Sequence, residues 1–141
     1  LARFDGDAPR VIAQGVPASF GLLTSYTGTP RAARMDHFDG DSGRLLLGRS
    51  PDDIGAWQEL GAHVAPQFVA FSWFMPALLF LDDWDPARGS GTLIAYNYDL
   101  DARSTIAEGV TSFDMTSYPL DGVVYAVPKG NQRGIWFSKA K

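Results

Sequence analysis

The chain has 141 residues, of which 45% are hydrophobic and none is cysteine, and its formal net charge is −4. This length and apolar content suffice for one domain with a core and exclude a disordered chain, and the acidic balance excludes nucleic acid as the main partner. The lack of cysteine excludes disulfides and cysteine-ligated zinc, and no run reaches the ~20 apolar residues of a membrane-spanning helix.

The first predicted elements are two short strands, residues 1–4 and 9–16, joined by a turn with two aspartates. The phrase FDGDAPRVIAQGV at 4–16 returns as YDLDARSTIAEGV at 98–110. A repeated phrase indicates a structural unit that is used more than once. Because Asp side chains accept hydrogen bonds from nearby backbone amides, we expect Asp99 and Asp101 to close the same strand–turn–strand hairpin.

A weaker copy of the phrase, GRSPDDIGAWQELGAHV, stands at 48–64. This is the one stretch where a helix competes with a strand, since Ser50 or Asp52 has the chemistry of a helix cap. We predict a strand, because the counterparts at 9–16 and 103–110 are strand-like.

Further along the chain, short segments rich in β-branched and aromatic residues alternate with Pro, Gly, Asp and Asn clusters, as strands and turns do. Some, such as ALLF at 77–80, are apolar on consecutive residues, which indicates a sheet covered on both faces. The predicted strands are 68–73, 77–84, 92–100, 104–110, 111–118, 122–127 and 134–141.

Several landmarks recur in one order with a period of about 45–48 residues. Among them are a Ser-aromatic pair and a following proline: Ser25-Tyr26, Ser72-Trp73 and Ser117-Tyr118, then Pro30, Pro76 and Pro119. A four-stranded unit of this length is typical of a β-propeller blade. We therefore predict one all-β domain of antiparallel propeller blades over residues 1–141, divided into units 1–16 (partial), 17–64, 65–110 and 111–141 (partial, without a fourth strand).

The phrase YNYDLDARSTIAEGV at 96–110 resembles the strand–turn–strand of TolB-type, WD40-like propeller repeats, although the Gly-His and Trp-Asp marks of true WD40 repeats are absent. The resemblance implies a binding module of the kind found in bacterial envelopes. It therefore implies a periplasmic or secreted location, and a cysteine-free chain fits the cytoplasm as well.

Propellers usually have four to eight blades, and this chain supplies about three. We expect a protein partner or self-association to complete the ring, for example two copies that exchange N-terminal strands. Because the chain begins at Leu1 without Met, it also reads as a processed or excised piece of a longer protein.

The candidate ligand-binding residues lie in predicted loops and at the end of one strand. A Trp beside charges suits contact with a sugar or a peptide, and the alternative is a Trp that covers its own sheet. A histidine could act as a general base, although a surface role is the simpler reading of both histidines in the chain. The candidates are His63, Trp84, Asp85, Arg88, Asn131 and Arg133.

Asp36, Asp39 and Asp41 bring three carboxylates together, which is the ligand chemistry of calcium, but their spacing favours a turn. Asp39 and Asp41 are thus weak metal candidates, and we predict no metal or other cofactor. No Gly-x-Ser-x-Gly or other catalytic set is present. We expect a non-enzymatic binding or scaffolding module; the alternatives are a carbohydrate-binding, lectin-like oligomer and the non-catalytic propeller part of a hydrolase.

Overall fold

The computed structural model describes residues 2–4, 9–11, 20–24, 30–48, 56–66, 68–70, 76–116 and 122–139; for 2–4, 9–11, 20–24, 30–32 and 68–70 it describes the backbone alone. These residues form strands and turns without any helix, so the prediction of an all-β chain is confirmed. No segment of this described part is a helix that is long and apolar enough to span a membrane.

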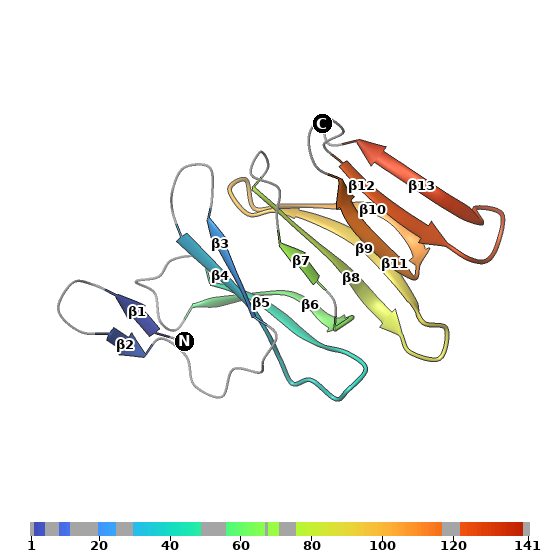
Figure 1. Ribbon diagram of the computed structural model, residues 1–141. Helices are drawn as coiled ribbons and strands as arrows, with labels where there is room; N and C mark the ends of the chain where they lie inside the picture. Colours follow the sequence, from blue (N-terminus) through green and yellow to red (C-terminus); the bar gives the residue numbers. More distant parts are fainter. Residues whose placement is uncertain are drawn as a thin grey trace.

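The strands form four antiparallel sheets, in which each strand pairs with its neighbour in sequence (Figure 1). The N-terminal hairpin has two strands, β1 (Ala2–Phe4) and β2 (Pro9–Val11). The first sheet has β3 (Phe20–Thr24), β4 (Pro30–Asp36), β5 (Gly43–Gly48) and β6 (Trp57–Val64). The second has β7 (Phe68–Ala70), β8 (Ala77–Asp85), β9 (Ser90–Asn97) and β10 (Ala102–Val110), and the third has β11 (Ser112–Thr116), β12 (Gly122–Val127) and β13 (Gly134–Lys139).

Within residues 48–64, where a helix competed with a strand, the structure has the strand β6, which pairs with β5. The sheets seen in the described residues do not close into a ring, so a propeller is not established. The recurring Ser-aromatic pairs (Ser25-Tyr26, Ser72-Trp73 and Ser117-Tyr118) lie outside the described residues.

The last two strands of the first and second sheets pair in the same register. In the ladder of β5 with β6, the pairing shifts twice, on either side of the pair Leu45–Gly61. In the ladder of β9 with β10 it shifts twice on either side of Leu93–Ala107. Each shift marks a β-bulge, an extra residue on one strand that bends the strand and increases its twist. Their recurrence at equivalent positions is the clearest structural sign of a repeated unit.

The first sheet packs against one face of the second. Leu78 and Phe80 of β8 are fully buried there, together with Leu45 and Leu47 of β5. Side chains alternate across a strand, so every second residue of β8 faces the first sheet. The full cluster is Ala33, Met35, Leu45, Leu47, Leu60, Val64, Leu78, Phe80, Ile94, Tyr96 and Tyr98.

The third sheet packs against the opposite face of the second. Leu79 and Leu81, the intervening residues of β8, are buried there with Leu93 of β9 and with Val123 of β12. The second sheet is thus covered on both faces, which is why β8 is apolar on consecutive residues. Between the sheets the chain crosses directly, and the N–H groups of Ala65 and Thr111 donate to backbone carbonyls of the following sheet at 2.9 and 3.0 Å.

The turn between β9 and β10 differs from the expectation in one respect. Asn97 Oδ1 accepts the N–H groups of Asp99 and Leu100, both at 3.0 Å, and so performs the role expected of the aspartates. Asp101 instead accepts hydrogen bonds from the Tyr96 hydroxyl and from Gln58 of the first sheet. This turn therefore also ties two sheets together.

Candidate functional site

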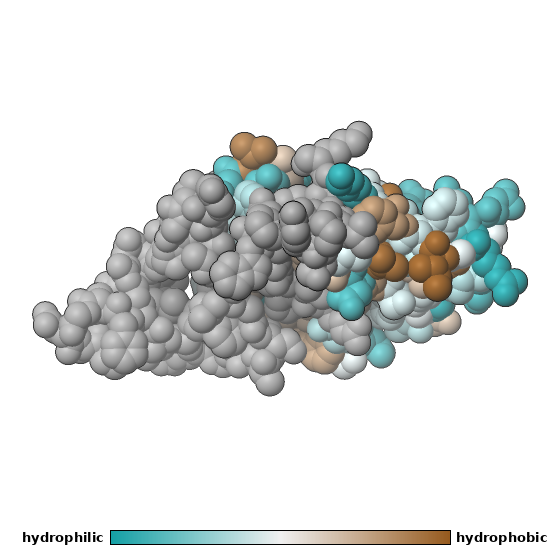
Figure 2. Space-filling model, turned by 45° about the horizontal axis from the view of Figure 1, so that its top comes forward, coloured by the Kyte–Doolittle hydropathy of each residue, from teal (hydrophilic) through white to brown (hydrophobic). Residues whose placement is uncertain are grey.

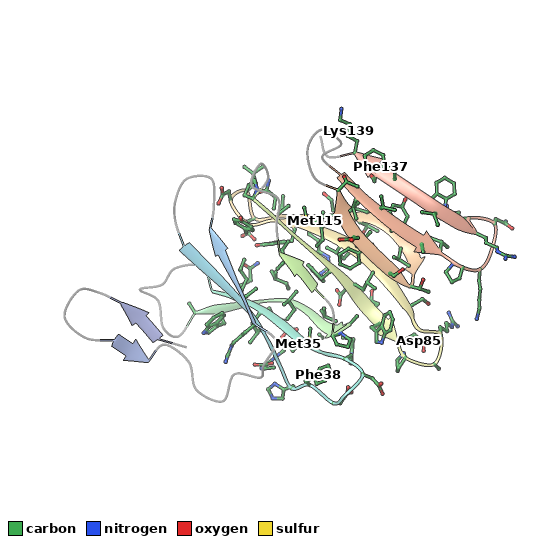
Figure 3. All side chains as sticks on the ribbon, in the orientation of Figure 1. Met35, Phe38, Asp85, Met115, Phe137 and Lys139 are labelled. Atoms are coloured by element: carbon green, nitrogen blue, oxygen red, sulfur yellow. The ribbon has the colours of Figure 1, made fainter. Side chains whose placement is uncertain are left out.

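Three hairpin turns follow one another from the bottom to the right edge of the molecule, between β4 and β5, β8 and β9, and β12 and β13 (Figure 1). Figure 3 labels Phe38 in the first of these turns and Asp85 at the start of the second. All the predicted ligand residues except His63 lie in or beside the second and third turns.

Asp85 organises the turn between β8 and β9. Its Oδ1 accepts the N–H groups of Ala87 and Arg88 at 2.9 and 3.2 Å, and its Oδ2 lies 3.1 Å from Arg88 Nε. Gly89 takes the left-handed conformation that the tight turn requires, with φ of 61°. Asp85 thus has a structural function in the turn, whatever else it contacts.

Trp84 is half-buried and packs against the cluster between the second and third sheets. It therefore covers its own sheet, as the simpler of the two sequence interpretations had it. Asn131 and Arg133 lie in the exposed turn between β12 and β13. Within the described residues, no hydrogen bond or ion pair joins Trp84 or Arg88 to either of them, and a shared rim stays a prediction.

Asp39 and Asp41 form a turn rather than a cluster of ligands. Asp39 Oδ1 accepts the N–H groups of Asp41 and Ser42 at 2.9 and 2.8 Å. These bonds, from Ser42 first, lower the pKa of Asp39, and His63 of β6 adds an electrostatic contribution. The described residues contain no group of three metal-ligating side chains.

Asp36, the third aspartate of that stretch, belongs to an ion-pair group. Arg44 donates to both of its carboxylate oxygens, at 2.8 and 3.1 Å, and His37 Nδ1 lies 2.9 Å from Oδ1. The Arg44 guanidinium holds the pKa of Asp36 at about 2, below its usual value of 3.8. Arg34 stacks on the Trp57 ring beside this group, 4.7 Å from the ring centre.

A polar bridge between the first and second sheets was not apparent from the sequence. Arg103 of β10 donates to Asp82 Oδ2 of β8 and to the Leu60 carbonyl of β6, both at 2.6 Å. Asp82 is buried, and a Cβ on Gly61 would come within 2.6 Å of its Oδ1. Glycine at this position therefore makes room for the buried carboxylate.

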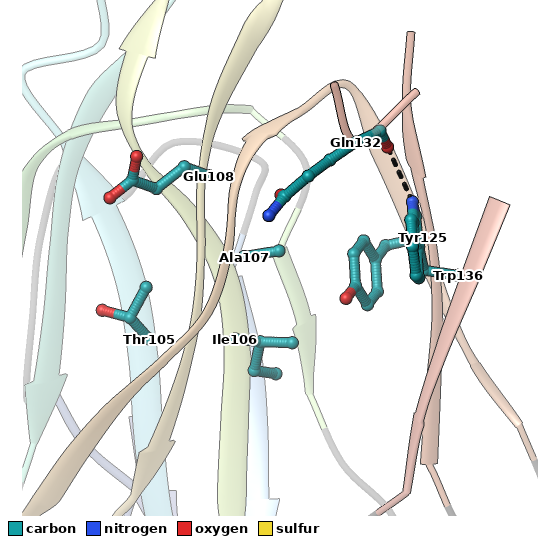
Figure 4. A pocket seen from close by; sticks show the side chains of 7 residues that line it. All are labelled: Thr105, Ile106, Ala107, Glu108, Tyr125, Gln132 and Trp136. Atoms are coloured by element: carbon teal, nitrogen blue, oxygen red, sulfur yellow. Dashed lines mark hydrogen bonds between the residues drawn. The ribbon is translucent and has the colours of Figure 1, made fainter. Parts of the chain in front are cut away.

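A cleft of about 460 Å³ opens between β10 and the third sheet (Figure 4). Tyr125 and Trp136 oppose each other on β12 and β13 and lie side by side in the cleft. The Trp136 indole donates to the Gln132 carbonyl at 2.8 Å, which fixes the ring. The remaining lining residues are Thr105, Ile106, Ala107 and Glu108, all on β10.

The bulge in β10 explains why two consecutive residues contribute to one wall of this cleft. The register shifts between Thr105 and Ala107, so Ile106 is the extra residue on that strand. Figure 4 shows Ile106 and Ala107 on the side of Tyr125, and both pack partly against the cluster between the second and third sheets. From the sequence, Trp136 is only an aromatic residue in a predicted strand. The face of the sheet on which it lies depends on the strand register, which the sequence does not give.

Comparison of this chain with protein-family models, with curated proteins and with solved structures finds no match. The arguments for function therefore come from the chain's own architecture.

Proposed function

We propose that this chain is a non-enzymatic binding or scaffolding module, built of propeller-type blades, that completes its stack of sheets with another polypeptide surface. The observation that carries the proposal is the burial of the second sheet on both faces by sheets built like it. The two like registers, each with two shifts at equivalent places, support a repeated unit designed to stack.

The outer face of the third sheet has the composition of an interface. The pairs Val124–Phe137 and Ala126–Ile135 place four apolar residues on one face, opposite to the face that carries Tyr125. Phe137 is 47% and Ile135 81% exposed. Figure 2 shows brown apolar side chains among teal ones on the right of the molecule, where Figure 1 has the third sheet. An apolar centre with a polar surround is typical of a protein–protein interface.

The proposed setting is a bacterial envelope or secreted complex, which rests on the resemblance of residues 96–110 to TolB-type repeats. We also propose that the chain has no catalytic activity. A panel of hydrolase substrates tested on the purified protein should give no turnover above the rate of the buffer, and turnover of any class would contradict it.

Light scattering coupled to size-exclusion chromatography tests the scaffolding function directly. We expect a species larger than the 15.3 kDa of one chain. The buried apolar area gained on association is the reason, since a sheet face of this kind gains stability from being covered. A stable 15.3 kDa monomer at all concentrations would overturn self-association.

Carbohydrate binding is a second candidate, and the cleft favours it. Tyr125 and a fixed Trp136 offer flat aromatic faces, and the Gln132 amide offers hydrogen-bond partners for sugar hydroxyls.

On a glycan array, Trp136→Ala should lose binding by about tenfold or more, because it removes one stacking face. Phe38→Ala, an exposed aromatic in the turn between β4 and β5, is the matched control and should bind as the parent does. An array without any hit, or equal loss in both variants, would exclude the cleft.

A further inference from the structure

β13 is an open sheet edge. In the described residues it pairs only with β12, whereas the corresponding third strands β5 and β9 each pair on both sides. Three consecutive residues of β13, Ile135, Trp136 and Phe137, are 81%, 45% and 47% exposed. Figure 3 places Phe137 and Lys139 along this strand. An edge strand that is apolar and free of proline is a template for pairing with a further strand.

The sequence contains a strand of the required kind. Residues 9–16 repeat residues 103–110, of which 103–110 belong to β10, the fourth strand of the second sheet. Among the residues that the structure describes, β2 pairs only with β1, over three residue pairs. A two-stranded ribbon of this length is marginally stable, so its partner is readily exchanged.

We propose that residues 9–16 of a second copy add to β13 as the fourth strand of the third sheet. The N-terminal hairpin and β13 lie at opposite ends of the molecule in Figure 1, which argues for another copy rather than the same chain. The proposal rests on the scaffolding function above, and names the partner and the strand that it uses.

The second sheet fixes the register of this pairing. Phe68 opposes Phe80 in the second sheet as Phe113 opposes Tyr125 in the third, which equates Leu78 of β8 with Val123 of β12. Their partners on the third strands, Tyr96 and Ser138, are therefore equivalent. In the second sheet Tyr96 opposes Arg103, and Arg103 is equivalent to Pro9 in the repeated phrase. Ser138 of one copy should therefore oppose Pro9 of the other.

Disulfide trapping tests this register, because the chain contains no cysteine of its own. Chains with Pro9→Cys are mixed with chains with Ser138→Cys and oxidised mildly. We expect a disulfide-linked dimer on a non-reducing gel, since opposed residues in a sheet have Cβ atoms within disulfide reach.

Ile135→Cys mixed with Pro9→Cys is the matched control, since Ile135 is exposed on the same strand. It lies three residues away, roughly 10 Å along the strand, which is beyond disulfide reach. The Ser138→Cys mixture should give roughly tenfold more dimer than this control. Equal yields would overturn the proposal.

Two further results are decisive. If light scattering gives a species larger than one chain but the Ser138→Cys mixture forms no disulfide, the strand pairing is wrong while the scaffolding function stands. If a chain with both Pro9→Cys and Ser138→Cys closes an internal disulfide as a monomer, the occupant is the chain's own segment.

Competition with a synthetic peptide of residues 9–16 tests the pairing on the unsubstituted protein, with the mass of the assembly as the measurement. Added in excess, the peptide should convert the assembled protein to single chains, because it occupies β13 in place of the second copy. A scrambled peptide of the same composition should not. The same response to both peptides would contradict pairing in a defined register.

Discussion

At the scale of single residues, the first sheet holds a group of charges around Asp36. Arg44 lies opposite Asp36 in the ladder of β4 with β5, and this register brings its guanidinium onto both carboxylate oxygens. Only 18% of the Asp36 side chain is exposed, so the pair is shielded in part from water. The consequence is a carboxylate that stays ionised to about pH 2.

Asp36→Asn should therefore destabilise the protein by about 1–2 kcal/mol at pH 7, after allowance for the exposure of Arg44. Because the folded-state pKa lies below the unfolded one, this stabilisation is full above about pH 4 and is lost as the pH falls towards 2. Urea denaturation across this range checks it: most of the difference between parent and variant should be lost by pH 2, the folded-state pKa of Asp36.

Asp41→Asn is the control for this experiment. Asp41 lies in the turn that follows Asp36, between β4 and β5. Within the described residues no ion pair includes its side chain. Its stability should follow that of the parent at every pH. A constant difference between Asp36→Asn and the parent from pH 7 to pH 2 would contradict the assigned cause.

The aspartates of this stretch also show what sequence could and could not predict. The spacing of Asp39 and Asp41 indicated a turn, and Asp39 accepts backbone N–H groups in one. The Arg44 partner of Asp36 was not foreseen, because it depends on the pairing of two strands and not on local chemistry.

At the scale of elements, Arg103 links three strands. It connects β10 to Asp82 on β8 and to the Leu60 carbonyl on β6, and it lies 5.8 Å from the centre of the Phe80 ring. A buried carboxylate is tolerated only with its partner in place. This bridge therefore holds the first two sheets in one alignment.

Arg103→Ala should cost about 3 kcal/mol, because it leaves the carboxylate of Asp82 buried without its cation. Arg88→Ala removes an exposed ion pair with Asp85 and should cost less than about 1 kcal/mol. Denaturation midpoints of the two variants compare them under one condition. Similar losses in both would show that the bridge contributes no more than a surface pair.

Strand positions were predicted better than strand ends. The segment 92–100 was expected to be one strand, whereas β9 runs from Ser90 to Asn97. The strand ends there because Asn97 accepts the N–H groups of the next turn. A short polar side chain competes with the ladder for backbone groups, and propensity alone does not reveal which of several such residues wins.

At the scale of the whole molecule, the described sheets form a stack in which the outer face of the third sheet carries exposed apolar side chains. The sequence correctly indicated short antiparallel strands, and the consecutive apolar residues of β8 indicated a sheet covered on both faces. Whether the sheets close into a ring cannot be predicted from strand patterns, because closure depends on how whole sheets pack and not on local sequence. The cleft beside Trp136 was missed for a related reason, since it arises where two sheets meet.

Ile135→Lys combined with Phe137→Lys should convert any assembly to single chains of 15.3 kDa, because two charges then stand on the open face. Leu100→Lys is the matched control, since Leu100 is 75% exposed in the turn between β9 and β10. Light scattering at equal concentrations checks both. A double variant with the mass of the parent assembly would place the contact elsewhere.

The paired bulges of the first two sheets have a consequence for growth of the stack. A bulge bends its strand and increases the local twist, so β6 and β10 have the same local shape at the bulge. We expect a sheet added by tandem duplication of residues 65–110 to meet the same strand shape at its junction. Gene fusion of such segments would then lengthen the stack by whole sheets.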